Sequence, residues 1–373
     1  MKRFQFHSLH PAIIFAILPA LFTLSSCRKQ TGTNPDNHAA RVWDCTGIEP
    51  DKIYDISSDL PSHRLLELEE NGNSTIGSVN KIITADSLLF VIDSNLAKRI
   101  FIFNLNTGKA IRSFGDTGSG PEEYSALQDV SYDEDRKLLY ALCDNKKILT
   151  FNLKGEITGT AQAPYPSHKM EYDNNLFYFY SEDINTGEIT VTDTAFNVLE
   201  SFFPNKDNPL QHRMLHPLMK SPQGELTYIR YMDNNIYQLH GTDSPKIRYT
   251  IDFGTDMYDR AEAEEDGEEG IKRKLGTRRG QIKYFVENSR YATILFFDRK
   301  EPCISMFDKQ TGTSRNAYVR NVSEEMFGML LSPIEYATDS CLIQVIDAAT
   351  IPGEIMADKS IAPNENPMLY FMK

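Results

Sequence analysis

The sequence predicts an all-β fold, a six-bladed β-propeller made of four-stranded antiparallel blades. Short runs rich in β-branched and aromatic residues alternate with Asp, Asn and Gly clusters from Asn80 onward, and helical periodicity is almost absent before residue 255. A unit of such runs returns roughly every 50 residues, which is typical of propeller blades. The last unit lacks its outer strands, and the two chain ends can supply them.

The first unit contains three predicted strands, Leu88–Asp93, Arg99–Asn104 and Ala110–Gly115, joined by tight turns. A shorter version follows at Leu138–Asp144 and Ile148–Asn152. Each run fits the length of a strand and ends at turn-forming residues. These segments therefore indicate two consecutive blades.

The spacing of one aromatic position predicts how many blades follow. Phe103 and Phe151 are 48 residues apart, and Phe151 and Phe307 are 156 apart, or three steps of 52. Two further units should therefore lie between the last two positions. Degenerate versions of the pattern are present there, at Leu176–Ser181 with Ile189–Asp193 and at Leu226–Tyr231 with Asn235–Leu239.

The sixth blade is predicted to form from both chain ends. It begins with Leu331–Tyr336 and Cys341–Ile346, and Pro367–Phe371 can return as its third strand. Either Ile53–Ile56 or Leu65–Leu68 can supply the fourth strand. Pairing of the two ends would close the ring, whereas an open propeller would expose unpaired strand edges.

These segments resemble the NHL-type and TolB-like six-bladed β-propellers, and more closely their lipid-anchored bacterial members. The resemblance is carried by Phe90–Asp93 with Lys98–Phe103, by Ser113–Tyr124 as an inter-blade turn, and by Leu65–Glu69 and Asn364–Phe371 as opening and closing strands. It implies the propeller fold. Such propellers include binding modules and a few lyases or hydrolases, so the resemblance leaves the activity open.

The first 26 residues are predicted to be a lipoprotein signal peptide that is removed. Lys2 and Arg3 precede the apolar run Ala12–Leu24, which is too short to span a bilayer. Leu24–Cys27 resembles a bacterial lipobox, which implies cleavage before Cys27 and acylation of that cysteine, for example with palmitate. The alternative is an ordinary secretion signal in which Cys27 has no role.

The predicted organisation after cleavage is a lipidated, flexible tether over residues 27–50 and the propeller over residues 51–373. The membrane is then a partner through the lipid on Cys27, and the expected location is the cell envelope, at the outer membrane facing the periplasm. No acidic residue follows Cys27 before Asp36, which favours the periplasmic side. The net charge changes from -13 to -15 once Lys2 and Arg3 are removed, which argues against nucleic acid as a partner.

A charged insertion at about residues 255–280 separates the fourth and fifth units. Eight acids between Asp256 and Glu269 are followed by five bases from Lys272 to Arg279. We expect a loop or short helix across one face of the ring. Its role is either that of a solvated surface segment or that of a lid or docking element.

Glycines and histidines give two weak candidate sites. Gly115, Gly118 and Gly120 suggest a phosphate-binding loop, but no Lys-Ser or Lys-Thr pair follows them, so a turn is the better interpretation. His212 and His216 have the spacing of zinc ligands on a helix, but nearby prolines and the lack of an HExxH pattern favour loop histidines.

Aspartates and cysteines also have two interpretations each. Asp93, Asp144 and Asp233 end strands before turns, where bonding to backbone amides is favoured over calcium binding. Four cysteines after Cys27 allow three disulfide pairings, and buried free thiols are the alternative, best supported for the second and fourth. These cysteines are Cys45, Cys143, Cys303 and Cys341.

The sequence assigns no catalytic, metal-binding or ligand-binding residue and no cofactor, and Cys27 is its one assigned functional position. We therefore expect a membrane-anchored envelope lipoprotein whose propeller face binds a protein, peptide or glycan without catalysis. The alternative is an envelope hydrolase or lyase with its site at the mouth of the central channel.

Overall fold

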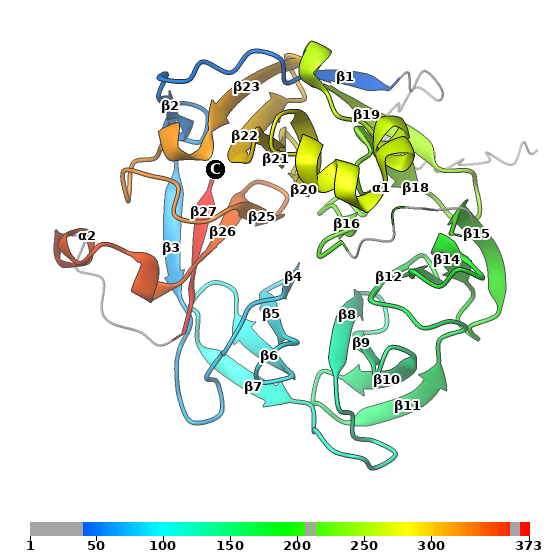
Figure 1. Cartoon of the computed structure of the whole chain (residues 1–373). Helices are drawn as coiled ribbons and strands as arrows, with labels where there is room; N and C mark the ends of the chain where they lie inside the picture. Colours follow the sequence, from blue (N-terminus) through cyan, green and yellow to red (C-terminus); the bar gives the residue numbers. More distant parts are fainter. Residues whose placement is uncertain (1–39, 206–209, 211–213, 359–365) are drawn as a thin grey trace, which may run out of the picture. The chain divides into compact units, whose positions relative to one another are not determined.

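The computed structural model describes residues 40–205, 210, 214–358 and 366–373. The signal peptide and Cys27 lie outside these residues. The described chain forms six blades around a central axis (Figure 1). This confirms the predicted six-bladed, four-stranded, antiparallel propeller.

Blades 1 to 3 follow one another along the chain. Blade 1 comprises β4 (Lys81–Ala85), β5 (Leu88–Asp93), β6 (Arg99–Asn104) and β7 (Ala110–Phe114). Blade 2 comprises β8 (Leu127–Asp133), β9 (Leu138–Cys143), β10 (Lys147–Asn152) and β11 (Ile157–Gln162). Blade 3 comprises β12 (Lys169–Asp173), β13 (Leu176–Tyr180), β14 (Gly187–Thr192) and β15 (Val198–Pro204).

Blades 4 to 6 include the contributions of the N-terminal region. Blade 4 comprises β16 (Leu218–Lys220), β17 (Leu226–Ile229), β18 (Asn235–Leu239), β19 (Lys246–Asp252) and the added β1 (Arg41–Asp44). Blade 5 comprises β20 (Arg279–Glu287), β21 (Tyr291–Asp298), β22 (Glu301–Asp308) and β23 (Thr313–Tyr318). Blade 6 comprises β25 (Ile334–Ala337), β26 (Leu342–Ile346), β27 (Met368–Met372) and β3 (His63–Glu67).

The ring closes in blade 6 through strands from both ends of the chain. β27 pairs with β26 on one side and with β3 on the other, in a register that aligns Met368 with Glu67 and Met372 with His63. Of the two predicted fourth strands, the structure thus uses the one around Leu65–Leu68. The other segment forms β2 (Tyr54–Asp55), which pairs in parallel with β24 (Val322–Ser323) beside blade 5.

The burial of each strand follows its place in the blade. Residues 89–93 of β5 are all buried, because the middle strands are covered by neighbouring blades on both faces. The outer strand β11 alternates between half-buried and exposed side chains, as expected where one face meets water. Two-residue turns join some strands, and Asn174 and Asn175 both adopt positive φ between β12 and β13.

Strand β1 belongs to the segment that the sequence analysis assigned to the tether. It pairs in parallel with β19, and Trp43 is fully buried against Tyr249 and Phe307. The Trp43 indole nitrogen donates a hydrogen bond of 2.7 Å to Ser305. The folded body therefore starts before residue 51, because a large aromatic side chain is held between blades 4 and 5.

The charged insertion folds as helix α1 (Arg260–Lys274), with a break where Gly267 adopts φ 65°. Short helical segments η1 (Ile56–Ser58), η2 (Gly254–Asp256), η3 (Val319–Asn321), η4 (Ala348–Thr350) and α2 (Gly353–Asp358) complete the described structure. No helix in the described ranges has the length and apolar character needed to cross a membrane.

Candidate functional site

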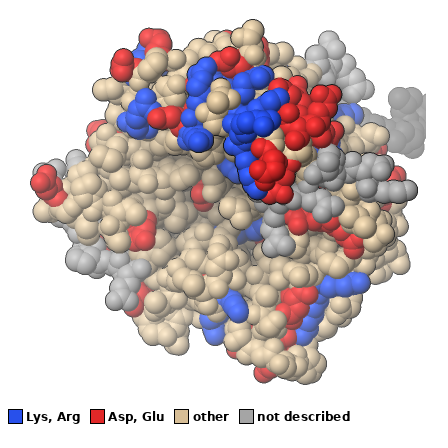
Figure 2. Space-filling view, in the orientation of Figure 1, with Lys and Arg blue, Asp and Glu red and all other residues tan. Residues whose placement is uncertain are grey.

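A cavity of about 600 Å³ occupies the centre of the ring, and we call it the central channel. The innermost strand of every blade contributes to its wall, namely β4, β8, β12, β16, β20 and β25. The space-filling view shows a hollow in the middle of the face seen there (Figure 2). A cavity of this size is within the range of small-ligand sites.

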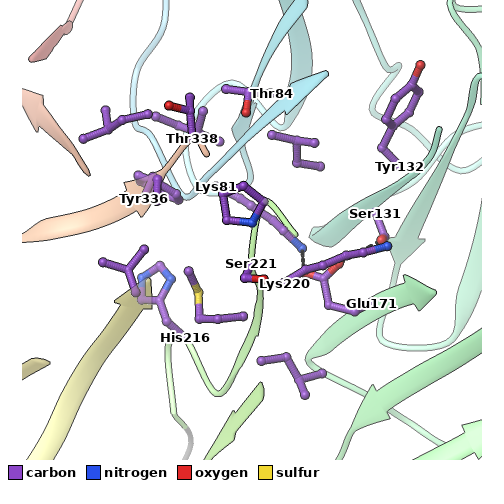
Figure 3. A pocket seen from close by; sticks show the side chains of 18 of the residues that line it. Lys81, Thr84, Ser131, Tyr132, Glu171, His216, Lys220, Ser221, Tyr336 and Thr338 are labelled. Carbon is purple, nitrogen blue, oxygen red and sulfur yellow. Dashed lines mark hydrogen bonds and ion pairs between the residues drawn. The ribbon is translucent and has the colours of Figure 1, made fainter. Parts of the chain in front are cut away.

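One wall of the channel carries a cluster of four polar side chains, Lys81, Asp129, Ser131 and Glu171, which we call the Lys81 cluster. The ammonium of Lys81 lies 3.2 Å from Asp129 Oδ1 and also contacts Glu171 Oε1 (Figure 3). Ser131 donates a hydrogen bond of 2.9 Å to the other oxygen of Glu171. Three adjacent blades thus meet through one lysine.

The structure stabilises the charges of this cluster unequally. Backbone N–H groups of residues 130 and 170 each donate a 2.9 Å hydrogen bond to Asp129. Burial raises the pKa of Glu171, although Lys81 opposes the rise. Burial alone would lower the pKa of Lys81, but Asp129 and Glu171 together raise it. Lys81 therefore stays charged at neutral pH.

His216 lines another part of the channel wall, and behind it Tyr284 and Glu335 continue a row of contacting side chains. The ring of His216 packs against that of Tyr284 with 5.0 Å between centroids, and Tyr284 hydrogen-bonds to Glu335. Burial, with help from the nearby Lys169, lowers the pKa of His216 to about 4, so its imidazole is neutral at pH 7. Burial raises the pKa of Glu335 to about 7.

Two tyrosines in the wall have buried hydroxyls without a partner among the described protein atoms. They are Tyr132, from β8, and Tyr336, from β25, and both line the channel. Tyr336 is 5% exposed and Tyr132 is 8% exposed. A buried hydroxyl without a hydrogen bond costs about 1–3 kcal/mol. The channel wall therefore offers hydrogen-bonding capacity that the surrounding protein does not use.

The three aspartates at strand ends hold turns, as the sequence analysis favoured. Asp93 accepts hydrogen bonds from the N–H groups of Gly77, Ser78 and Leu96, each 2.8 Å long. Asp144 likewise accepts from residues 125 and 126. Asp233 accepts from the N–H of residue 235 at 2.9 Å. In the described part of the chain, no group of three or more His, Cys, Asp or Glu is placed to hold a metal ion.

The glycine-rich segment is a turn between blades 1 and 2. Gly115 adopts φ 113°, and the Tyr124 hydroxyl would be 2.2 Å from a Cβ added there. Lys147 donates to the backbone oxygens of Gly120 and Glu123, which fixes the turn from inside. These contacts explain why residue 115 is a glycine, and a bound phosphate is not needed to explain it. His216 lines the channel, and His212 lies outside the described residues, so the structure does not test the weak zinc pair.

The four cysteines after Cys27 are free thiols in the structure. Cys45, Cys143 and Cys303 are buried, and Cys341 is half-buried. Burial raises the pKa of the Cys45 and Cys143 thiols well above the ordinary value. The sequence left two states open for these cysteines, disulfide-bonded and free, and the structure has the free thiols.

Helix α1 packs on blades 3 and 4 and is held by its own ion pairs. Arg260 is buried and donates to the backbone oxygen of Tyr231 at 2.8 Å. Lys274 lies 2.8 Å from Glu262 and 2.7 Å from Asp266, so the acidic and basic parts neutralise each other. Basic and acidic atoms accordingly adjoin over this insertion (Figure 2). The described residues that line the channel include none from α1, so the helix does not wall the cavity.

The Lys81 cluster was not predicted, because the innermost strands of blades 1 to 3 that carry it were not predicted. A weak signal was available, since Lys81 and Asp129 are 48 residues apart, the same spacing as Phe103 and Phe151. Charged residues recurring at the blade period within strand-length segments would have indicated a shared inner wall.

Solved structures similar to this chain share its fold. One is a Bacteroides fragilis protein that is presumed to be exported, with a TM-score of 0.72 and 17% identity, covering 90% of this chain and 99% of the other. Another, from Bacteroides vulgatus, is a member of the DUF4221 family, with a TM-score of 0.53 and 10% identity, covering 87% and 98%. At these identities the likeness extends to the fold alone.

No curated protein matches the chain. A family model described as "Domain of unknown function (DUF4934)" matches residues 44–373, which include every blade of the propeller. Because this match covers most of the sequence, the chain belongs to the DUF4934 family.

Proposed function

We propose that this protein is a lipid-anchored binding protein of the bacterial cell envelope, and that its central channel takes the end of a peptide, protein segment or glycan. The anchor is the predicted lipid on Cys27, at the outer membrane with the propeller in the periplasm. The presumed export of the similar Bacteroides fragilis protein supports an envelope location. We also propose that the chain is related to the NHL-type and TolB-like propellers.

The observation that carries the binding role is a cavity of about 600 Å³ whose wall combines aromatic and polar side chains, including two tyrosines whose buried hydroxyls have no partner among the described protein atoms. Peptide and glycan ends carry hydroxyl, carbonyl and amide groups that can pair with Tyr132 and Tyr336. The carboxylates of the Lys81 cluster are already paired with an ammonium, so they shape and polarise the wall. A mixed aromatic and polar wall of this kind is characteristic of ligand sites.

Site-specific photocrosslinking tests the channel as the binding site. Leu215 lines the channel and is 65% exposed, and Ile111 on the outer strand β7 is 52% exposed. We expect benzoylphenylalanine at position 215 to yield a discrete adduct in intact cells, and the same group at position 111 to yield none. Equal adducts from both positions, or none from position 215, would contradict the proposal.

The variant Tyr336→Phe tests the contact without disturbing the packing. Loss of a hydroxyl that has no protein partner should leave the melting temperature unchanged or raise it. The adduct yield from position 215 should fall, because the ligand loses one hydrogen bond. An unchanged yield would mean that this hydroxyl does not contact the ligand.

The anchor is tested separately by growth with an alkyne analogue of palmitate. We expect label on the wild-type protein in the membrane fraction, and loss of both label and membrane association in Cys27→Ser. Labelled protein in the variant would exclude Cys27 as the lipidation site.

An envelope hydrolase or lyase is the second candidate, and the row formed by His216, Tyr284 and Glu335 favours it. A neutral imidazole and a carboxyl with a pKa of about 7 are suited to general acid–base work. Under this alternative, purified protein should convert envelope peptides or glycans, and Glu335→Gln should abolish conversion. If the purified protein holds the peptide or glycan without converting it, the result would favour the binding role over the enzyme.

A further inference from the structure

A second cavity, of about 450 Å³, lies between blades 4 and 5, and we call it the basic pocket. Four of the six side chains that line it are cationic. The lining residues are Arg41, Arg248, Ser289, Arg290, Lys309 and Gln310. Such a grouping stands out in a chain whose net charge is -13.

A buried glutamate fixes two of these cations in place. Glu287 is 2% exposed, and its carboxylate lies 3.0 Å from Arg248 Nε and 3.0 Å from Lys309 Nζ. The Tyr249 hydroxyl also donates to it at 3.1 Å. Glu287 thus holds the two side chains together before any ligand arrives, which lowers the ordering cost of binding.

The cations of the basic pocket exceed the carboxylates that pair with them. Arg248 pairs with Glu225 and Glu287, Lys309 shares Glu287, and Arg290 lies 3.3 Å from Asp308. Arg41 makes no ion pair with any residue that the structure describes. Four cations therefore face three carboxylates, which leaves the pocket with one positive charge in excess.

Two of the arginines have their planar faces covered by aromatic rings. Arg248 lies over Tyr249, with its Cζ 5.6 Å from the ring centroid, and Arg290 lies over Tyr291 at 4.9 Å. This stacking limits the rotation of each guanidinium, whose N–H groups project from its edges. The arrangement suits a multidentate oxyanion, because a guanidinium edge matches two oxygens of phosphate.

We propose that the basic pocket binds a phosphate group, either as free phosphate or as the phosphate of an anionic lipid headgroup. The strand that carries Arg41 is the first element of the described residues. Arg41 follows Cys27 by 14 residues, which span at most about 50 Å when extended. The proposed anchor would thus keep the pocket within reach of headgroups. Free phosphate requires no such proximity.

Calorimetric titration of the full chain in a non-ionic detergent tests the pocket. The probes are inorganic phosphate and the soluble short-chain lipid dihexanoylphosphatidylglycerol, with sodium chloride of equal ionic strength as the blank. Arg41→Gln and the double variant with Arg290→Gln remove charge from the rim. The matched control is Arg112→Gln, an exposed arginine on β7 in blade 1.

We expect the wild-type protein and the control to bind phosphate equally. Affinity should fall by about tenfold or more in the double variant, because two hydrogen bonds between charged groups are lost. Arg41→Gln alone should give part of that loss with an unchanged melting temperature. Tighter binding of the short-chain lipid than of phosphate would identify a headgroup site, and the reverse order would identify a free-phosphate site. Absence of binding by both probes, or equal affinity in all variants, would overturn the proposal.

Discussion

Replacement of Lys81 by Met would leave two carboxylates in the channel wall without their shared cation. The Lys81 side chain is 17% exposed, and those of Asp129 and Glu171 are 3% and 7% exposed. Removal of one partner from a buried ion pair costs about 3–5 kcal/mol. Because Lys81 retains some contact with the channel, we expect a loss near the lower end, about 3 kcal/mol in the free energy of unfolding at pH 8.

The loss should depend on pH, and its sign follows from Glu171. Burial raises the folded-state pKa of Glu171 above the ordinary value of 4.5, so the native state binds its proton more tightly than the unfolded chain does. Such a group lowers stability as pH rises from the unfolded pKa through the folded one. Without Lys81 that rise in pKa is larger, so Lys81→Met should lose less stability at pH 5 than at pH 8.

Urea unfolding followed by fluorescence and by circular dichroism measures the effect. Trp43 is the only tryptophan of the chain and is fully buried, so its emission reports exposure of the blade 4 and 5 interface. The double variant with Glu171→Gln is the matched control, and it should recover part of the loss. A loss below about 1 kcal/mol, or an equal loss at pH 5 and pH 8, would refute a buried, charged Lys81 cluster.

Two further predictions concern ring closure and the half-buried Glu335. Deletion of residues 364–373 removes β27, the strand that joins β26 to β3. The whole propeller should therefore lose its cooperative unfolding transition. An unchanged melting temperature would show that the blades are stable without ring closure. Glu335 has a pKa raised to about 7 from the ordinary 4.5, so it should lower stability as pH rises through that interval, by at most on the order of 3 kcal/mol. Urea midpoints at pH 5 and pH 8 should therefore differ by less in Glu335→Gln than in the wild-type protein, and equal differences would show that Glu335 titrates normally.

The middle strands of the blades could be predicted because both of their faces are buried. Segments such as Leu88–Asp93 and Arg99–Asn104 are mostly apolar and lie between turn signals, and the structure places β5 and β6 there. Repetition at a fixed interval then gave the blade number. Ring closure followed from counting strands, since an incomplete sixth blade needed partners from the two chain ends.

The innermost strands of blades 1 to 3 could not be predicted in the same way, because one side of each borders a polar channel. Leu127–Asp133 contains two aspartates and a serine, and Lys169–Asp173 contains a lysine, a glutamate and an aspartate. Such compositions look like turns when apolar periodicity is the criterion. The pairing that makes them strands is tertiary, since Asp129 and Glu171 are neutralised by Lys81 from another blade.

The different roles of the middle and innermost strands also limit what can be inferred about this chain from its similarity to other proteins. Packing between blades depends on the middle strands, so proteins with 17% and 10% identity still share the fold. The innermost strands add buried residues such as Val130 and Met170 to that packing, and they also carry the polar side chains that line the channel. The chemistry of the channel therefore has to be read from residues such as Lys81, Glu171 and Tyr336 in this chain, and conservation of those positions, more than of the blades, would indicate a shared ligand.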